Sequence, residues 1–142
     1  MLELKTEITT DASIKAVWAK LTDFEAYPHW NPFITRIEGN QAVGKTLVVD
    51  IVPPGGKKAT FKPILTRFAE NDEMRWVGTL GQKWLFQGEH YFKLLSIEGN
   101  KTQLIHGEIF TGLLVPLFSA LAGKKTRAGF ELMNQGIKNA LQ

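Results

Sequence analysis

Residues 39 to 56 read GNQAVGKTLVVDIVPPGG, and the first eight letters match the nucleotide-binding pattern G-x-x-x-x-G-K-[ST] at every fixed position. In a P-loop, the glycine-rich turn leads into a helix whose free N–H groups bind phosphates. Here the turn leads into residues 47–52, a β-branched run that ends at the turn cluster 53–56. We therefore interpret residues 39–46 as a connection between two antiparallel strands, and we expect no nucleotide site.

Runs with alternating apolar residues continue on both sides of this stretch. They predict seven strands, at residues 2–9, 33–38, 46–52, 59–69, 73–80, 83–97 and 101–111. Turn residues separate neighbouring runs, so we expect an antiparallel meander.

Helical spacing appears in two places. After a cap at Asp11 or Ser13, apolar residues follow a helical period to residue 21, and a second short turn ends near Tyr27-Pro28. From residue 113 to the end, apolar residues recur every three or four positions and predict a long helix, with a kink or loose segment at 122–129 caused by glycines. The pattern as a whole is typical of an α+β fold.

The composition limits the classes of protein that fit. A chain of 142 residues predicts one domain, residues 1–142, and the net charge of +3 with scattered basic residues disfavours nucleic-acid binding. The absence of cysteine excludes thiol nucleophiles, thiolate metal sites and disulfides. The first residues alternate charged and apolar side chains, so we expect no signal peptide and no stable membrane insertion, and a soluble cytoplasmic protein. The oligomeric state is left open.

The predicted final hairpin contains two of the three histidines. If residues 98–100 form a three-residue loop, Ile97 pairs with Lys101 and His90 faces Glu108. His90 then points inward, because the even-numbered residues of its strand are mostly apolar. A two-residue loop would shift the register by one and turn Glu108 outward, so the position of Glu108 stays open.

The same register places Phe92 opposite His106. Two interpretations of the polar residues remain. His90 and Glu108 could bind a ligand group or transfer protons, or His90, Glu108 and His106 could only satisfy one another as a buried polar patch. We expect no metal site, since a third convergent element with ligands is missing from the pattern.

Residues 23–34, DFEAYPHWNPFI, resemble the motif D...YP.WNPFI of small bacterial members of the START-related SRPBCC superfamily, often labelled polyketide cyclase/dehydrase-like. Three further motifs agree: the glycine loop at 43–45 with PPG at 53–55, GEHYF at 88–92, and HGEIFTGLLVP at 106–116. The resemblance implies the helix-grip fold of the birch pollen allergen. In that fold, a seven-stranded curved antiparallel sheet wraps a long C-terminal helix, two short helices follow strand 1, and an apolar cavity lies between.

Whether the interior is hollow cannot be decided from the pattern, because aromatic residues beside glycines also occur in filled cores. We predict binding, and potentially transport, of a small apolar, aromatic or lipid-like molecule, with no cofactor. One alternative is a cyclase or aromatase that uses His90 and Glu108 as acid–base groups, and another is an accessory, co-chaperone-like interaction domain. The predicted ligand-binding residues are Trp30, Trp76, Trp84, Phe86, His90, Phe92, His106, Glu108, Phe110, Phe118 and Met133.

Residues 113–118 are strongly apolar and precede a basic stretch at 124–127. They fit either a contact with a membrane surface or the entry of the long helix into the core. The sequence favours the second interpretation.

Overall fold

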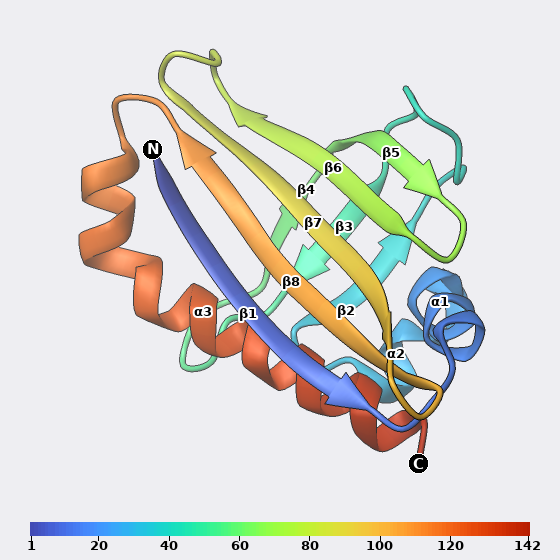
Figure 1. The fold of residues 1–142 in the computed structure, drawn as a ribbon. Coiled ribbons are helices and arrows are strands. Elements are labelled where there is room, and N and C mark those ends of the chain that lie inside the picture. The colour runs from blue at the N-terminus through green and yellow to red at the C-terminus, as the bar shows by residue number, and fades with distance from the viewer.

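A computed structural model describes all 142 residues. Five strands form a curved antiparallel sheet in the order β1-β8-β7-β6-β5, and a smaller sheet, β2-β3-β4, lies behind it in the view of Figure 1. The elements are β1 (Leu2–Thr10), α1 (Ile14–Thr22), the 3-10 helix η1 (Phe24–Ala26), α2 (Tyr27–Trp30), β2 (Ile34–Glu38), β3 (Val48–Ile51), β4 (Ala59–Phe61), β5 (Ile64–Ala69), β6 (Glu73–Leu80), β7 (Phe86–Ile97), β8 (Lys101–Thr111) and α3 (Val115–Ala140).

Helices cover one side of the larger sheet. α3 runs along β1 and β8, while α1 and α2 close the end of the sheet near the β7–β8 hairpin (Figure 1). The expected helix-grip arrangement of a curved antiparallel sheet and a long C-terminal helix is therefore confirmed.

The prediction of seven strands is wrong, because the run 59–69 forms two strands in different sheets. β4 pairs with β3 and β5 pairs with β6, and the chain changes sheets at Pro63. A proline has no N–H group to donate to a ladder, so a strand does not continue evenly through it. The sheets stay joined here, since Leu47 N–H donates to Pro63 C=O (2.8 Å) and Leu65 N–H donates to Lys45 C=O (2.9 Å).

The P-loop-like string is a connection between β2 and β3, as predicted. These two strands pair antiparallel, and residue 46 forms a bridge with Ile64 instead of starting a helix. Gly39 and Gly44 have φ values of +138° and +91°, which glycine adopts without strain.

The helix starts follow ordinary capping rules, with one departure from the prediction. The hydroxyl of Ser13 accepts a hydrogen bond from Ala16 N–H (3.2 Å) and caps α1. Pro28 was expected to end a helix, but it lies in the first turn of α2, where no intrahelical N–H is needed.

We predicted a kink or a loose segment at 122–129; α3 is one α-helix from Val115 to Ala140, so the chain is not loose there, but the helix bends along its length in Figure 1. Its glycines serve close packing. A Cβ on Gly129 would lie 2.4 Å from the ring of Phe33, and a Cβ on Gly136 would lie 2.6 Å from the carbonyl oxygen of Trp30. Glycine thus lets the helix approach β2 and α2 more closely than other residues would allow.

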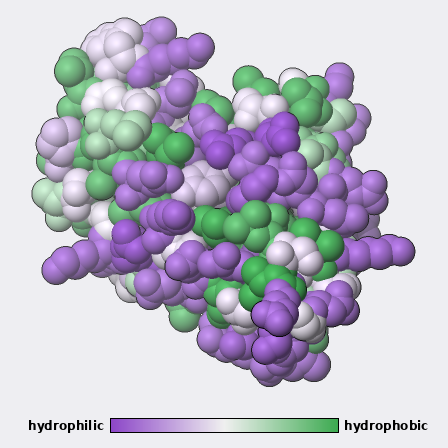
Figure 2. Space-filling view, in the orientation of Figure 1, coloured by the Kyte–Doolittle hydropathy of each residue, from purple (hydrophilic) through white to green (hydrophobic).

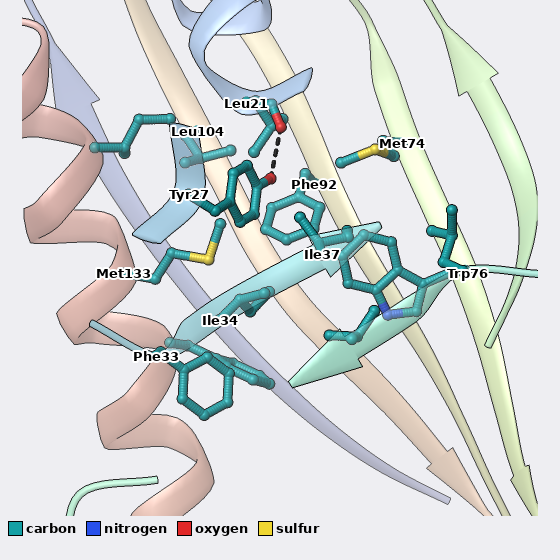
Figure 3. Close-up of a cluster of buried hydrophobic side chains, with 14 of the residues drawn as sticks. Leu21, Tyr27, Phe33, Ile34, Ile37, Met74, Trp76, Phe92, Leu104 and Met133 are labelled. Atoms are coloured by element: carbon teal, nitrogen blue, oxygen red, sulfur yellow. Dashed lines mark hydrogen bonds between the residues drawn. The ribbon is translucent and has the colours of Figure 1, made fainter. Parts of the chain in front are cut away.

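The main core fills the space between α2, α3 and the middle of the larger sheet (Figure 3). Tyr27 is fully buried in it, and its hydroxyl donates to the carbonyl oxygen of Leu21. Burial disfavours the charged phenolate, which raises the pKa of Tyr27 far above its usual value. Phe92, Leu104 and Met133 have no exposed surface in this cluster.

Candidate functional site

The hairpin loop sets the register of the candidate site. Gly99 and Asn100 have φ values of +80° and +59°, and Ile97 pairs with Lys101 across a three-residue loop. His90 therefore lies opposite Glu108, as predicted from the loop length. Glycine and asparagine are the residues that adopt this left-handed backbone most readily, which explains why the loop closes here.

Three polar side chains from β7 and β8 form a continuous chain of contacts beneath the sheet. His90 Nδ1 lies 3.2 Å from Glu108 Oε1, and His90 Nε2 lies 2.7 Å from His106 Nε2. His106 is fully buried, whereas 19% of the side-chain surface of Glu108 is exposed. The polar groups thus run from the interior to a partly open space.

α3 and β1 anchor the buried end of this chain. His106 Nδ1 lies 2.9 Å from Asn134 Oδ1, and Asn134 Nδ2 donates to Thr6 Oγ1 (2.8 Å). Thr6 Oγ1 in turn donates to the carbonyl oxygen of His106 (2.7 Å). Neither residue was predicted from the sequence, although Asn134 is a polar residue on the apolar side of α3 between Phe130 and Ile137, which was a usable signal.

The buried imidazole is held neutral. Burial lowers the pKa of His106 well below its usual value, and the neighbouring His90 lowers it further because two positive charges would repel each other. Aromatic rings enclose the pair: Trp76 stacks on His90 with ring centroids 5.1 Å apart, and Phe130 stacks on His106 at 4.5 Å.

A cavity of about 230 Å³ lies between the two sheets and α3, with His90 and Glu108 in its lining. Gly78 and Gly88 pair across β6 and β7 and both line the cavity, so the two adjacent strands present no side chain to it at this one position. The lining residues are Phe33, Ile34, Val49, Ile51, Phe61, Lys62, Pro63, Trp76, Gly78, Thr79, Leu80, Phe86, Gly88, His90, Glu108, Phe110, Phe118 and Thr126.

Six of the residues predicted to bind a ligand line this cavity: Trp76, Phe86, His90, Glu108, Phe110 and Phe118. Phe92 and Met133 lie in the filled core, and His106 contacts the cavity only through His90. The prediction missed the wall contributed by β2, β3 and β4, because strand patterns do not show how a second sheet packs against the first.

The other two tryptophans that were predicted to bind a ligand, Trp84 and Trp30, do not line the cavity. β7 begins at Phe86 and not at residue 83, so Trp84 lies in the preceding turn, where 64% of its surface is exposed. Trp30 packs edge-on against Tyr27 and borders a surface depression between α2 and the end of α3. Asn31 Oδ1 accepts from the backbone N–H groups of Phe33 and Ile34 and so stabilises the turn after α2.

No group of three or more histidine and carboxylate side chains is arranged to hold a metal ion. No helix combines the length and apolar composition needed to cross a membrane.

The fold and the lined cavity define a START-like helix-grip protein. The family model described as "Polyketide cyclase / dehydrase and lipid transport" matches residues 1–142, so the chain belongs to this family, within the SRPBCC superfamily that its motifs resemble. No curated protein matches the sequence.

Solved structures share the fold at low sequence identity. A START superfamily protein from Mycobacterium smegmatis is 22% identical with a TM-score of 0.72, and the match covers 98% of this chain and 96% of that one. Ara h 8.0201 is 18% identical with a TM-score of 0.65, covering 97% and 98%. The Aha1 protein from Colwellia psychrerythraea, solved as a dimer, is 18% identical with a TM-score of 0.71, covering 99% and 96%.

Proposed function

We propose that this protein binds a small, mainly apolar molecule in the cavity between its two sheets. The observation that carries the proposal is a lined hollow where a filled core would otherwise continue: paired glycines on β6 and β7 face aromatic rings from β7, β8 and α3. Apolar walls with a few polar groups at one place are typical of ligand sites. The family description, which includes lipid transport, supports the same class of ligand.

The size of the cavity limits the ligand. A dry protein cavity of about 150 Å³ accommodates benzene, so 230 Å³ suits a molecule of one or two fused rings or a short branched chain. Larger ligands would require Phe61, Leu80 or Phe118 to move, and all three retain exposed surface.

Titration with naphthalene, followed by Trp76 fluorescence, tests the proposal. The matched control is Gly78→Leu, which fills the cavity from a position where an added Cβ meets only Pro63, at 3.9 Å. We expect saturable binding to the native protein and at least tenfold weaker binding to the variant. A variant in which every other tryptophan is replaced by phenylalanine assigns the signal to Trp76. Equal binding by native protein and Gly78→Leu would contradict the proposal, as would no binding at all.

A second candidate function is proton transfer, and the contact between His90 and Glu108 favours it. A carboxylate and an imidazole 3.2 Å apart at the cavity wall form a pair that can exchange a proton with an enolisable ligand. The test is deuterium exchange into a small cyclic ketone, measured by NMR in heavy water. Exchange catalysed by the native protein and lost in Glu108→Leu would establish this activity, and rates equal to the buffer rate would exclude it for that ketone.

A further inference from the structure

We propose that the ligand carries a hydrogen-bond donor, a hydroxyl or N–H group, that binds the free carboxylate oxygen of Glu108. This inference rests on the proposed binding function and names the polar group of the ligand. It follows from the placement of every proton along the buried chain of contacts.

Hydrogen bonds at the buried end of this row of contacts fix which nitrogen of His106 carries its proton. Thr6 gives its one hydroxyl proton to the carbonyl oxygen of His106, so it can only accept from the Asn134 amide. The Asn134 carbonyl oxygen therefore faces His106 Nδ1, and that nitrogen must carry a proton. Because buried His106 is neutral, its Nε2 has a bare lone pair.

The second proton follows from the first. His90 Nε2 lies 2.7 Å from the bare Nε2 of His106, so it must be the donor in this contact. His90 Nδ1 then faces Glu108 Oε1 at 3.2 Å. One proton must lie between these two atoms, on either partner, since two lone pairs would otherwise point at each other.

Both arrangements of that proton have the same consequence for the cavity. Either His90 donates this proton or protonated Glu108 does. In both cases the second oxygen of Glu108, Oε2, is left as an acceptor. No protein group donates a hydrogen bond to Oε2, which lies over the backbone of Gly88, where an added Cβ would be only 2.3 Å away. Glu108 thus presents an unpaired acceptor to the cavity.

The threonines of the lining present no free hydroxyl proton either, so they also offer the ligand only acceptor oxygens. Thr126 donates its hydroxyl proton to Ala122 C=O (2.8 Å), and Thr79 donates to Gln87 Oε1 (3.4 Å). Lys62 is exposed. An anionic ligand group placed beside Glu108 would meet an oxygen that also has lone pairs, and so it would be disfavoured.

The experiment compares 2-naphthol, which donates a hydrogen bond, with 2-methoxynaphthalene, which cannot, and with naphthalene. We expect the native protein to prefer 2-naphthol over both by about threefold or more, a range that spans hydrogen bonds to a neutral and to a charged acceptor. Glu108→Leu removes the acceptor and should abolish the preference. Glu108→Gln keeps an amide oxygen as an acceptor and should retain part of it.

A variant that keeps the charge provides an independent check. In Gly88→Ala, the added methyl group should displace Glu108 Oε2 and reduce the preference, although the carboxylate remains. Equal affinity for all three compounds would overturn the donor inference while leaving apolar binding intact. Failure of naphthalene and both derivatives to bind would overturn the proposed function together with it.

A row of leucines at the start of α3 is exposed on the outer surface near the cavity. Leu113, Leu117 and Leu121 recur every fourth residue and are 71%, 55% and 73% exposed. Trp84 adjoins them, because Leu113 N–H donates to its carbonyl oxygen (3.0 Å). Apolar side chains gather over the first turns of α3 in Figure 2. The exposed Leu80 ends β6, before the turn that carries Trp84, and it also lines the cavity.

The charges around this surface have one sign. Residues 52–66, 78–88 and 109–130, which supply β4, the β6–β7 turn and the first half of α3, contain seven of the 17 lysines and arginines and none of the 14 acidic residues. The basic residues are Lys57, Lys58, Lys62, Lys83, Lys124, Lys125 and Arg127. An exposed tryptophan and leucines beside basic residues match the interface of an anionic lipid bilayer.

We infer that this face docks on anionic membrane surfaces without inserting a helix across them. Sedimentation with phosphatidylcholine vesicles, with and without phosphatidylserine, tests the inference. We expect binding only with phosphatidylserine, lowered at least tenfold by Lys124→Glu/Lys125→Glu and by Leu117→Ser/Leu121→Ser. The matched control Lys15→Glu/Lys101→Glu makes the same charge change elsewhere and should reduce binding much less. No binding, equal binding to both vesicles, or an equal effect of the control would overturn it.

Discussion

The two ends of the space beneath β7 and β8 are built from the same strands and the same helix, but one is filled and the other is hollow. Near the hairpin, Phe92 and Leu104 pack without exposed surface against α1, α2 and α3. Toward the other end, Gly88 pairs with Gly78, and the lack of a side chain at both positions leaves a hollow, the cavity. His90 and Glu108 stand at the boundary, so the polar contacts begin where the packing stops.

A change in side-chain size over a few residues can thus separate a core from a site on one sheet. β7 places Phe92, His90 and Gly88 in succession on its inner face, from large to polar to none. Buried polar groups are costly unless they are satisfied, and here Asn134 and Thr6 satisfy them from the filled side.

The same substitution at the two ends should give the largest contrast. Phe130→Ala removes a fully buried ring that packs on Phe33 and His106, and we expect it to lower the free energy of unfolding by about 3–5 kcal/mol. Phe118→Ala removes a partly exposed ring at the cavity and should cost well under half as much, since a hollow is already present. Urea unfolding measures both, and equal losses would show that the two ends are packed alike.

The filled end should also weaken in mild acid. The pKa of His106 is depressed in the folded protein. As the pH falls below about 6.5, the usual pKa of histidine, the unfolded chain therefore takes up a proton at this side chain and the folded chain does not. Stability is therefore complete above that pH and falls as the pH drops, by at most about 1.4 kcal/mol per pH unit for this group.

Urea unfolding between pH 7.5 and 5.5 (about one unit either side of the histidine value) checks this expectation. Asp50, whose pKa is lowered to about 2 by hydrogen bonds from Arg36 and Thr60, changes its charge below this window and does not contribute. A His106→Asn variant, even if less stable, should show a flatter pH dependence. An unchanged slope would assign the acid sensitivity to another group.

The smallest effect should come from the glycine pair at the hollow end. Gly78→Ala adds a methyl group into open space, and we expect a change in stability within about 0.5 kcal/mol. Gly88→Ala should also fold, because the atom in its way is the flexible end of Glu108, but that carboxylate must move away from His90. A crystal structure of each variant distinguishes the two, and an unmoved Glu108 in Gly88→Ala would refute the close contact.

Local patterns were sufficient for much of this fold. Alternation predicted most strands. The pairing of His90 with Glu108 was predicted only on the condition that residues 98–100 form a three-residue loop, and the structure meets that condition. The change of sheets at Pro63 and the exposed position of Trp84 were missed, because apolar residues continue through both points without a change of period. The wall formed by the smaller sheet, and the anchoring of His106 by Asn134 and Thr6, depend on contacts between distant segments that no local period encodes.

Residues 98–100 form the exposed tip of the β7–β8 hairpin. Exposed hairpin tips usually tolerate insertions and deletions well. Losing one residue from this tip would shift β8 against β7 by one position and turn Glu108 to the outer face of the sheet, although the tip lies at the far end of both strands from the cavity. Among descendants of a common ancestor, the length of this turn should therefore be inherited together with the chemistry of the cavity, whatever residues the turn contains.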